Sequence, residues 1–383
     1  MMQAVRARQL FDGLRLVTDP VVVIDGTTIV GVGAEVSPGV EVLDLGDATL
    51  LPGLVDTHQH LVFDGSGSIE EQVADRTDGE LRDRACANAR RALQAGITTI
   101  RDLGDRNFVT LDLRDDPELP TILAAGPPLT AEGGHCWFLG GCCRDAEALI
   151  AAVHERKRRG CDVVKIMVTG GALTSTFPMW VSQFTAEDVA TVVATAHVLG
   201  LPVAAHCHGV DGTKQALAAG VDTIEHCTFF TANGCSEPDD ALLARIAASG
   251  TPVSATWGRL PAHPAPPMIE ASRFAVHGAM QRLHALGGTV VVGTDAGISP
   301  GKPHDVLPYA AHDLAAMGLD AAEILTTLTA TAAAVCGVGP RKGRLAVGYD
   351  ADIIAVDGDP LADVDDLIRT RLVMARGRLV VGP

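Results

Sequence analysis

Two histidines placed two residues apart are the first residues in this chain whose spacing suits chemistry. His58 and His60 close a short apolar run, and the two-residue period of a strand points both imidazoles to the same side. Imidazole is a good zinc ligand, and a zinc site with an open position generates hydroxide from water near neutral pH. Two histidines on one strand face also occur as ordinary polar surface, so the pair alone leaves both interpretations open.

Further apolar runs also end in side chains that can bind a metal. One histidine at a strand end is more often a packing or rim residue, but here five runs present such side chains. Active sites of (β/α)8 barrels lie at the carboxyl ends of the strands, so we expect these side chains to converge on one metal site. They are His58, His60, Lys165, His206, His226 and Asp295.

The elements that must position these residues alternate in a regular rhythm. Helical patterns at 79–96, 145–160, 185–200, 212–220 and 274–287 each lead towards a short apolar run. Apolar strands flanked by helices predict a parallel sheet buried on both faces. A doubly wound sheet also fits this rhythm, but it would gather its site at one switch point, whereas here the polar residues follow many strands. We therefore predict a (β/α)8 barrel.

Local signals mark the ends of these helices. Thr185 and Asp188 have the form of a capping box, with Asp in place of Glu or Gln. Glycines occupy the positions where helices should stop, namely Gly96, Gly160, Gly200, Gly220 and Gly287.

The two ends of the chain resemble each other and differ from the middle. Residues 1–50 and 340–383 contain short alternating strands, with turns expected at Asp25-Gly26 and Arg376-Gly377. Each set has too few strands to be stable alone. We therefore expect both to pair into one small β-sandwich domain, with 51–339 forming the barrel.

Composition excludes some classes of partner. The 30 Lys and Arg residues against 47 Asp and Glu residues give a formal charge of −17, which argues against nucleic acid. Long apolar segments and a signal-like start are missing from the sequence, so membrane insertion and export are not expected. The nine cysteines are an odd number scattered among apparent core segments, which favours free thiols in a reducing compartment, the cytoplasm.

The motifs, taken in order, resemble the amidohydrolase superfamily, and within it the branch of imidazolonepropionase-like and Xaa-Pro dipeptidase-like metal-dependent hydrolases. The resemblance spans nearly the whole chain. It implies a distorted (β/α)8 TIM barrel, a small β-sandwich built from both termini, and a centre of divalent metal, usually zinc. The motifs are PGLVDTHQH, ARRALQAGITTIRDLG, VVKIMVTGG, VAAHCHG, DTIEHC, VGTDAG and GYDADIIAVDGDPL.

The resemblance also implies roles for the predicted ligands. His58 and His60 would hold the more buried of two metal ions together with Asp295. His206 and His226 would hold the second ion. Asp295 would also act as general base and then general acid for a hydroxide that the metals activate.

Lys165 would bridge the two metals, which requires a carbamate formed from its amine and carbon dioxide. Burial in an apolar strand lowers the pKa of lysine and supplies the neutral amine that this reaction needs. The alternative is a Lys165 that only pairs electrostatically with Asp295.

Two further histidines lie near the predicted ligands in the sequence or in the resemblance. His208 follows His206 on the same strand face, where dipeptidase-like relatives often carry a substrate-contacting Tyr. We expect His208 to contact the substrate and support catalysis, with a metal-ligand role in place of His206 or a rim position as alternatives. His135 follows a glycine pair and resembles the family's substrate-binding loop.

The Pro-rich stretch 258–270 should form a loop over the barrel mouth, where Arg259 could anchor an anion or simply be a solvated charge. We expect the remaining histidines to be surface or packing residues: His154, His197, His263, His277, His284, His304 and His312.

These expectations favour a binuclear metal hydrolase that cleaves an amide bond in a small molecule such as a dipeptide or N-acyl amino acid. A deaminase or cyclic amide or amidine hydrolase using the same site is the alternative among enzymes. A ligand-binding protein with a dead site would have lost a ligand, and the six residues are all present. Loops set barrel specificity, so the substrate is not fixed by this pattern; a homo-oligomer is the default assembly.

Overall fold

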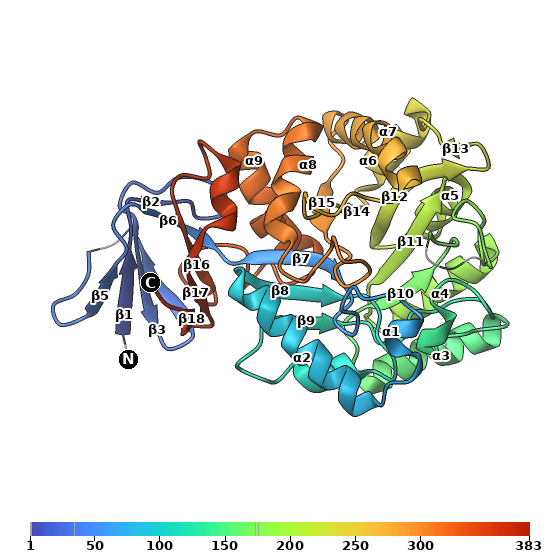
Figure 1. Cartoon of the computed structure of the whole chain (residues 1–383), viewed down its shortest axis with the longest axis horizontal. Helices are drawn as coiled ribbons and strands as arrows, with labels where there is room; N and C mark the ends of the chain where they lie inside the picture. The colour runs from blue at the N-terminus through green and yellow to red at the C-terminus, as the bar shows by residue number, and fades with distance from the viewer. Residues whose placement is uncertain (1, 34, 173, 175) are drawn as a thin grey trace.

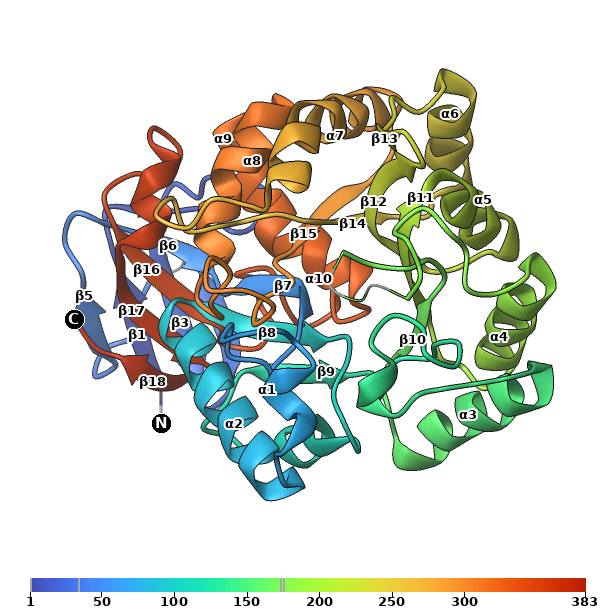
Figure 2. The same cartoon turned by 45° about the vertical axis from the view of Figure 1, so that its right-hand side comes forward.

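The computed structural model describes residues 2–33, 35–172, 174 and 176–383. It consists of a barrel and a smaller β-structure at one side of it, and both ends of the chain lie in the smaller part (Figure 1). A second view shows the helices arranged around the outside of the barrel strands (Figure 2).

The barrel is built from parallel strands that follow one another around a ring. In the described residues, β7, β8 and β9 pair in parallel, as do β10, β11, β12, β14 and β15. Parallel bridges from Gln59 to Ala296 and from Leu129 to Ile166 join the two sheets. The predicted (β/α)8 barrel is thereby confirmed, and its pairing is irregular between β7 and β8 and between β11 and β12, where the strand register shifts.

The barrel strands are β7 (Leu54–Gln59), β8 (Ile97–Asp102), β9 (Thr121–Ala124), β10 (Val164–Met167), β11 (Val203–Gly209), β12 (Thr223–Thr231), β14 (Val253–Thr256) and β15 (Val290–Gly293), and β13 (Gly234–Cys235) pairs with β12. The α-helices are α1 (Glu71–Ala74), α2 (Asp78–Gln94), α3 (Ala146–Arg159), α4 (Ala186–Val198), α5 (Val210–Ala219), α6 (Asp240–Ser249), α7 (Pro267–Ala285), α8 (Ala310–Met317), α9 (Ala321–Thr326) and α10 (Ala332–Val335). Short turns of other helix types are η1 (Val109–Leu113), η2 (Trp137–Leu139), η3 (Leu307–Tyr309), η4 (Thr327–Thr331) and η5 (Val364–Ile368).

The helices begin and end at the residues that the sequence marks. Thr185 and Asp188 form the expected capping box at the start of α4. Gly160 and Gly220 end α3 and α5 in the left-handed conformation, which glycine adopts without a steric cost. In the described part of the chain, no helix is both long and apolar enough to cross a membrane.

The smaller part has two sheets that share one apolar core. One sheet has the order β4-β3-β1-β5, and the other has the order β18-β17-β16-β6-β2. Val5 and Ile24 of the first sheet pack with Leu50, Ile353 and Leu372 of the second. Strands from both chain ends therefore bury each other's apolar faces, as neither set could do alone.

These strands are β1 (Met2–Arg6), β2 (Gln9–Leu10), β3 (Val21–Asp25), β4 (Thr28–Val32), β5 (Glu41–Asp44), β6 (Ala48–Pro52), β16 (Ile353–Asp357), β17 (Thr370–Ala375) and β18 (Arg378–Val381). The expected turn at Arg376-Gly377 joins β17 to β18, and both residues have positive φ, as a two-residue hairpin turn requires.

Candidate metal centre and the pocket beside it

The end of β7 and the residue after β15 bring three potential ligands together. His60 Nε2 lies 3.3 Å from Asp295 Oδ1, and His58 Nε2 lies 3.6 Å from the same oxygen. The two Nε2 atoms are 3.3 Å apart. The backbone N–H of Asp295 donates to the carbonyl of His58 at 2.7 Å, which fixes the carboxylate beside the histidines.

The other ring nitrogen of each histidine is held from behind. His58 Nδ1 lies 2.9 Å from Glu225 Oε2, and His60 Nδ1 lies 3.0 Å from the carbonyl of Gly104. Arg101 holds the second oxygen of Glu225 at 2.9 Å. Such partners fix the ring orientation of metal-binding histidines and raise their basicity. The sequence analysis missed Glu225 and Arg101, although Glu225 directly precedes His226.

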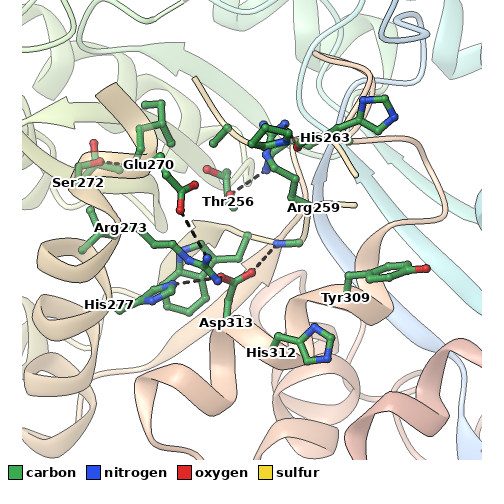
Figure 3. Close-up of a pocket in the computed structure, with 18 of the residues that line it drawn as sticks. Thr256, Arg259, His263, Glu270, Ser272, Arg273, His277, Tyr309, His312 and Asp313 are labelled. Carbon is green, nitrogen blue, oxygen red and sulfur yellow. Dashed lines mark hydrogen bonds and ion pairs between the residues drawn. The ribbon is translucent and has the colours of Figure 1, made fainter. Parts of the chain in front are cut away.

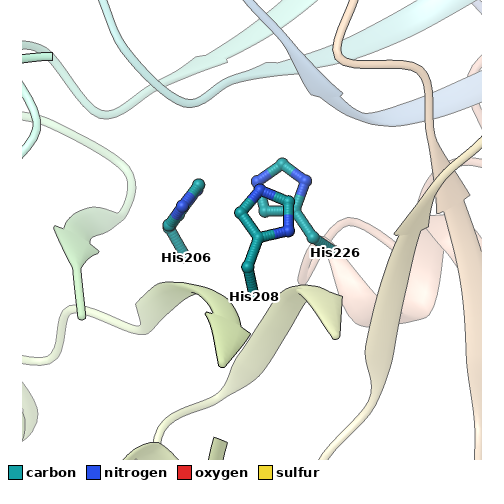
Figure 4. Close-up of side chains that lie close together, drawn as sticks. All are labelled: His206, His208 and His226. Carbon is teal, nitrogen blue, oxygen red and sulfur yellow. The ribbon is translucent and has the colours of Figure 1, made fainter. Parts of the chain in front are cut away.

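A second group forms where β11 and β12 end. The ring centroids of His206 and His226 are 4.4 Å apart, and His208 lies 4.6 Å and 4.5 Å from them (Figure 4). His206 Nε2 contacts the carbonyl of Gly170 at 3.0 Å, and His226 Nδ1 contacts the Thr256 hydroxyl at 2.9 Å. Each ring therefore keeps its other nitrogen for a further ligand.

Within the described residues, these two groups are the sets whose ligand atoms lie close enough to share a metal ion, within 4.8 Å of one another. The first contains His58, His60 and Asp295, and the second contains His206, His208 and His226. The second set thus includes His208, which the sequence analysis expected first as a substrate contact.

Lys165 lies beside the first group and is buried within β10, as the second residue of this strand. Its Nζ is 3.4 Å from His58 Nε2. Burial lowers the pKa of Lys165 to about 8, and the charge of this lysine adds to burial and to the neighbouring histidines in lowering the pKa values of His206 and His226. Lys165 is therefore electrostatically coupled to both groups.

The electrostatics of the site suit a metal. Burial, and then the charge of Lys165, lowers the pKa of His58 to about 4, and burial holds the pKa of His206 and His226 well below the ordinary value. Burial alone would raise the pKa of Asp295, but the hydrogen bond from His60 and nearby charges hold it well below the usual range. Neutral imidazoles with an ionised carboxylate are the protonation states that bind a divalent metal. His60 is the exception among these histidines: burial would lower its pKa, but the hydrogen bond to Asp295 and the charge of Asp295 raise it.

Two of the candidate ligands have unusual backbone conformations. His226 has φ 66° and Asp295 has φ 56°, both in the left-handed region that costs energy for residues other than glycine. The turn at His226 breaks the alternation of β12, so Glu225 reaches His58 while the adjacent His226 joins the second group. In a regular strand, the side chains of Glu225 and His226 would lie on opposite faces of the sheet, and only one of them would face the site.

Gly293 allows the closest approach between β15 and β7. A Cβ added at this glycine would lie 2.2 Å from His58 Cβ and 2.5 Å from the His58 nitrogen. The absence of a side chain at Gly293 therefore sets how closely the strand carrying Asp295 can approach the strand carrying His58.

The predicted substrate residues lie beside the second group. His208 Nδ1 contacts the Thr228 hydroxyl at 2.8 Å. His135 is buried, its ring centroid lies 4.7 Å from that of His206, and its Nδ1 contacts the Thr174 hydroxyl at 2.9 Å. All the candidate site residues named from the sequence thus lie in one connected cluster.

A cavity of about 460 Å³ opens next to the second group and includes His208 and His226 in its wall (Figure 3). The Pro-rich stretch contributes a loop as expected, but α7 begins inside it, at Pro267, because proline is tolerated in the first turn of a helix. Three histidines that the sequence analysis assigned to surface or packing also line the cavity: His263, His277 and His312.

Comparisons with known proteins agree with this arrangement. A model of the amidohydrolase family matches residues 49–380. The ochratoxinase of Aspergillus niger is 26% identical over 385 residues, which cover 87% of this chain and 76% of the relative. The imidazolonepropionase of Deinococcus radiodurans is 25% identical over 398 residues, covering 92% of this chain and 88% of the relative. A crystal structure of a Xaa-Pro dipeptidase with bound methionine matches 100% of both chains, with a TM-score of 0.84 and 26% identity.

Proposed function

The chain belongs to the amidohydrolase family, whose relatives are hydrolases acting on carbon–nitrogen bonds, and from this premise we propose that it cleaves the amide bond of a dipeptide or N-acyl amino acid with two divalent metal ions. The observation that carries this proposal is the pair of ligand groups, with Lys165 beside His58 of the first group and a cavity large enough for a small molecule beside the second. The order of the motifs adds support.

The ligand set fits zinc, which prefers nitrogen ligands combined with a carboxylate. Two bound zinc ions would lower the pKa of a water molecule and polarise the carbonyl of the amide. The residues that would hold them are His58, His60 and Asp295 for the first ion, His206 and His226 for the second, and Lys165 as a carbamate between them.

The protein's own groups would then move protons and hold the substrate. Asp295 binds both histidines through Oδ1, which leaves Oδ2 to take a proton from the attacking water and return it to the leaving nitrogen. His208 and His135 would contact the carbonyl side of the substrate from the cavity wall and from the loop before η2.

A ring-opening hydrolase or a deaminase is the second candidate, because an imidazolonepropionase is among the relatives. The products distinguish the two. Amide hydrolysis of an acyclic substrate gives two organic fragments, whereas a deaminase releases ammonia and a cyclic amidase gives one opened product. The buried Lys165, whose Nζ lies 3.4 Å from His58 Nε2, favours the first candidate.

Metal counting combined with a substrate panel tests the proposal. We expect the purified protein to contain two metal ions per chain and to split some dipeptides or N-acyl amino acids when supplied with zinc or manganese. Lys165→Ala should bind fewer ions and lose turnover, whereas Lys214→Ala, a change at an exposed lysine of α5, should leave both unchanged. Two ions at full occupancy in Lys165→Ala would refute the bridging role.

A further inference from the structure

The cavity beside the metal centre contains two arginines with different electrostatic surroundings. Arg273 Nη2 lies 3.2 Å from Asp313 Oδ1, and Arg273 Nη1 lies 3.8 Å from Glu270 Oε1. His277 also contacts Asp313, at 3.2 Å, as the dashed lines in Figure 3 show. The positive charge of Arg273 is therefore compensated by neighbouring carboxylates.

Arg259 donates its hydrogen bonds to neutral acceptors, whereas the carboxylates of Glu270, Asp295 and Asp313 act on its charge only from a longer range. Its Nη1 donates to the carbonyl of His263 at 3.3 Å, and its Nη2 donates to the Ser299 hydroxyl at 3.4 Å. None of the ion pairs recorded between described residues includes Arg259. A guanidinium has five N–H donors in a planar fork, so Arg259 keeps donors for a further acceptor.

Lys302 is the other cation in the cavity wall whose close partners are neutral. Its ammonium is buried and donates to the carbonyls of Thr256 at 2.9 Å and Thr294 at 2.6 Å. Lys302 thus holds the ends of two strands together, which leaves Arg259 as the more accessible of these two cations.

The position of Arg259 is fixed by close packing of its loop. A Cβ added at Gly301 would lie 2.4 Å from Arg259 Nη1 and 2.9 Å from His263 Cβ. The backbone N–H of Leu260 donates to the carbonyl of Gly301 at 2.9 Å, which ties the two loops together. The guanidinium therefore lies against a glycine that leaves room for it and for no larger residue.

One part of the cavity wall is apolar. Trp257 and Leu260 line it from the loop after β14, and Ile269 and Val276 line it from α7. Apolar side chains beside a cation that makes no direct ion pair complement a molecule that combines an apolar side chain with one negative charge. The chain as a whole carries a charge of −17, so an anionic substrate needs a local cation to bind here.

We propose that this cavity selects amide substrates with a free carboxylate next to a bulky apolar side chain, and that Arg259 binds the carboxylate. This inference rests on the proposed function and specifies its substrate class. A planar guanidinium binds a carboxylate through two parallel hydrogen bonds, which gives both affinity and orientation. The carboxylate-bearing half of the substrate would then lie in the cavity, with its amide carbonyl towards His208 and His226.

The test compares N-acetyl-leucine with N-acetyl-leucinol, which has a neutral alcohol in place of the carboxylate and no second amide bond. We expect the wild-type enzyme to favour N-acetyl-leucine in kcat/KM. Arg259→Gln should reduce this preference on the order of 10- to 100-fold, mainly through KM, and Arg259→Lys should restore part of it. Gly301→Ala, which displaces the guanidinium, should act in the same direction.

Arg282→Gln is the matched control, because it removes an arginine of α7 that pairs with Asp240 and does not line the cavity. It should change the rates on both substrates by similar factors and leave the preference intact. An unchanged preference in Arg259→Gln, or equal rates on both substrates in the wild type, would overturn the inference while leaving amide hydrolysis standing. If the wild type hydrolyses neither compound, calorimetry measures the binding of both compounds to the metal-loaded protein. Binding of N-acetyl-leucine that weakens in Arg259→Gln supports the inference. No binding of N-acetyl-leucine, or binding that is unchanged in Arg259→Gln, contradicts it.

Discussion

Glu225 contacts His58 through Oε2 and Nδ1, 2.9 Å apart, and its other oxygen contacts Arg101 at the same distance. The Thr223 hydroxyl also donates to this oxygen, at 2.6 Å. All of these side chains are buried. Burial alone would raise the pKa of Glu225, but Arg101 and His58 hold it well below the usual range, so a charged carboxylate lies behind the candidate metal ligand.

Replacing Glu225 with Ala should weaken metal binding by about 10- to 100-fold, because His58 would lose the partner that orients its ring. The variant should also lose on the order of 3–5 kcal/mol of stability, since Arg101 would be left as a buried charge without its partner. Chelator competition measures the first effect and thermal unfolding the second. Glu187→Ala, at an exposed acid of α4, is the control. Unaltered metal affinity in Glu225→Ala would remove Glu225 from the support of the site.

Asp295→Asn should retain much of the bound metal and lose turnover by about 100- to 10,000-fold, because an amide cannot accept the proton of the attacking water. Metal content and kcat must be measured on the same preparation. Asp211→Asn changes an exposed acid of α5 and should match the wild type in both. Wild-type turnover in Asp295→Asn would exclude the side chain as general base.

The barrel could be predicted from sequence because its signals are local. Each short apolar run and each helical pattern can be identified from its own residues, and the helix ends at Thr185 and Gly160 follow the ordinary capping rules. The same strand period predicted that His58 and His60 point together, and likewise His206 and His208. These pairs are neighbours in the structure.

Other features of the site depend on conformations and contacts that local patterns do not contain. The left-handed φ of His226 lets it and Glu225 face different parts of one site, against the alternation of a regular strand. Arg273 and Asp313 are in contact only because α7 and α8 pack together. The residues around either one therefore do not predict that Asp313 neutralises the charge of Arg273. Sequence patterns thus predict which strand ends carry the ligands, whereas the cavity wall depends on long-range packing.

His208→Gln tests the two roles left open for His208. The substrate role that we favour predicts unchanged metal content and a fall in kcat/KM on the order of 100-fold, as for a lost donor to the reacting carbonyl. Loss of one metal ion would instead identify His208 as a ligand in the second group, in which its ring lies 4.5 Å from that of His226. His284→Gln, at a half-exposed histidine of α7, controls for the loss of an imidazole.

Lys302 should make stability rise with pH in the alkaline range. Burial lowers the pKa of Lys302 from 10.5 to about 8 in the folded protein. Between these pH values the unfolded chain therefore binds more protons at this residue than the folded one, so stability contributed by this group increases as pH rises from about 8 to 10.5. The full effect is on the order of 3 kcal/mol.

Urea unfolding at pH 8, 9 and 10 should show this effect in the free energy of unfolding. The value for the wild type should rise with pH relative to the value for Lys302→Met, which lacks the titrating amine. Other groups that titrate in this range, including Lys165, are present in both proteins and cancel in the comparison. Lys214→Met removes an exposed amine and should give a difference that is constant with pH. A difference for Lys302→Met that stays constant with pH would contradict this prediction. It would mean that the amine of Lys302 keeps its proton as readily in the folded protein as in the unfolded chain. The hydrogen bonds from the ammonium to the Thr256 and Thr294 carbonyls would then offset the cost of burying its charge.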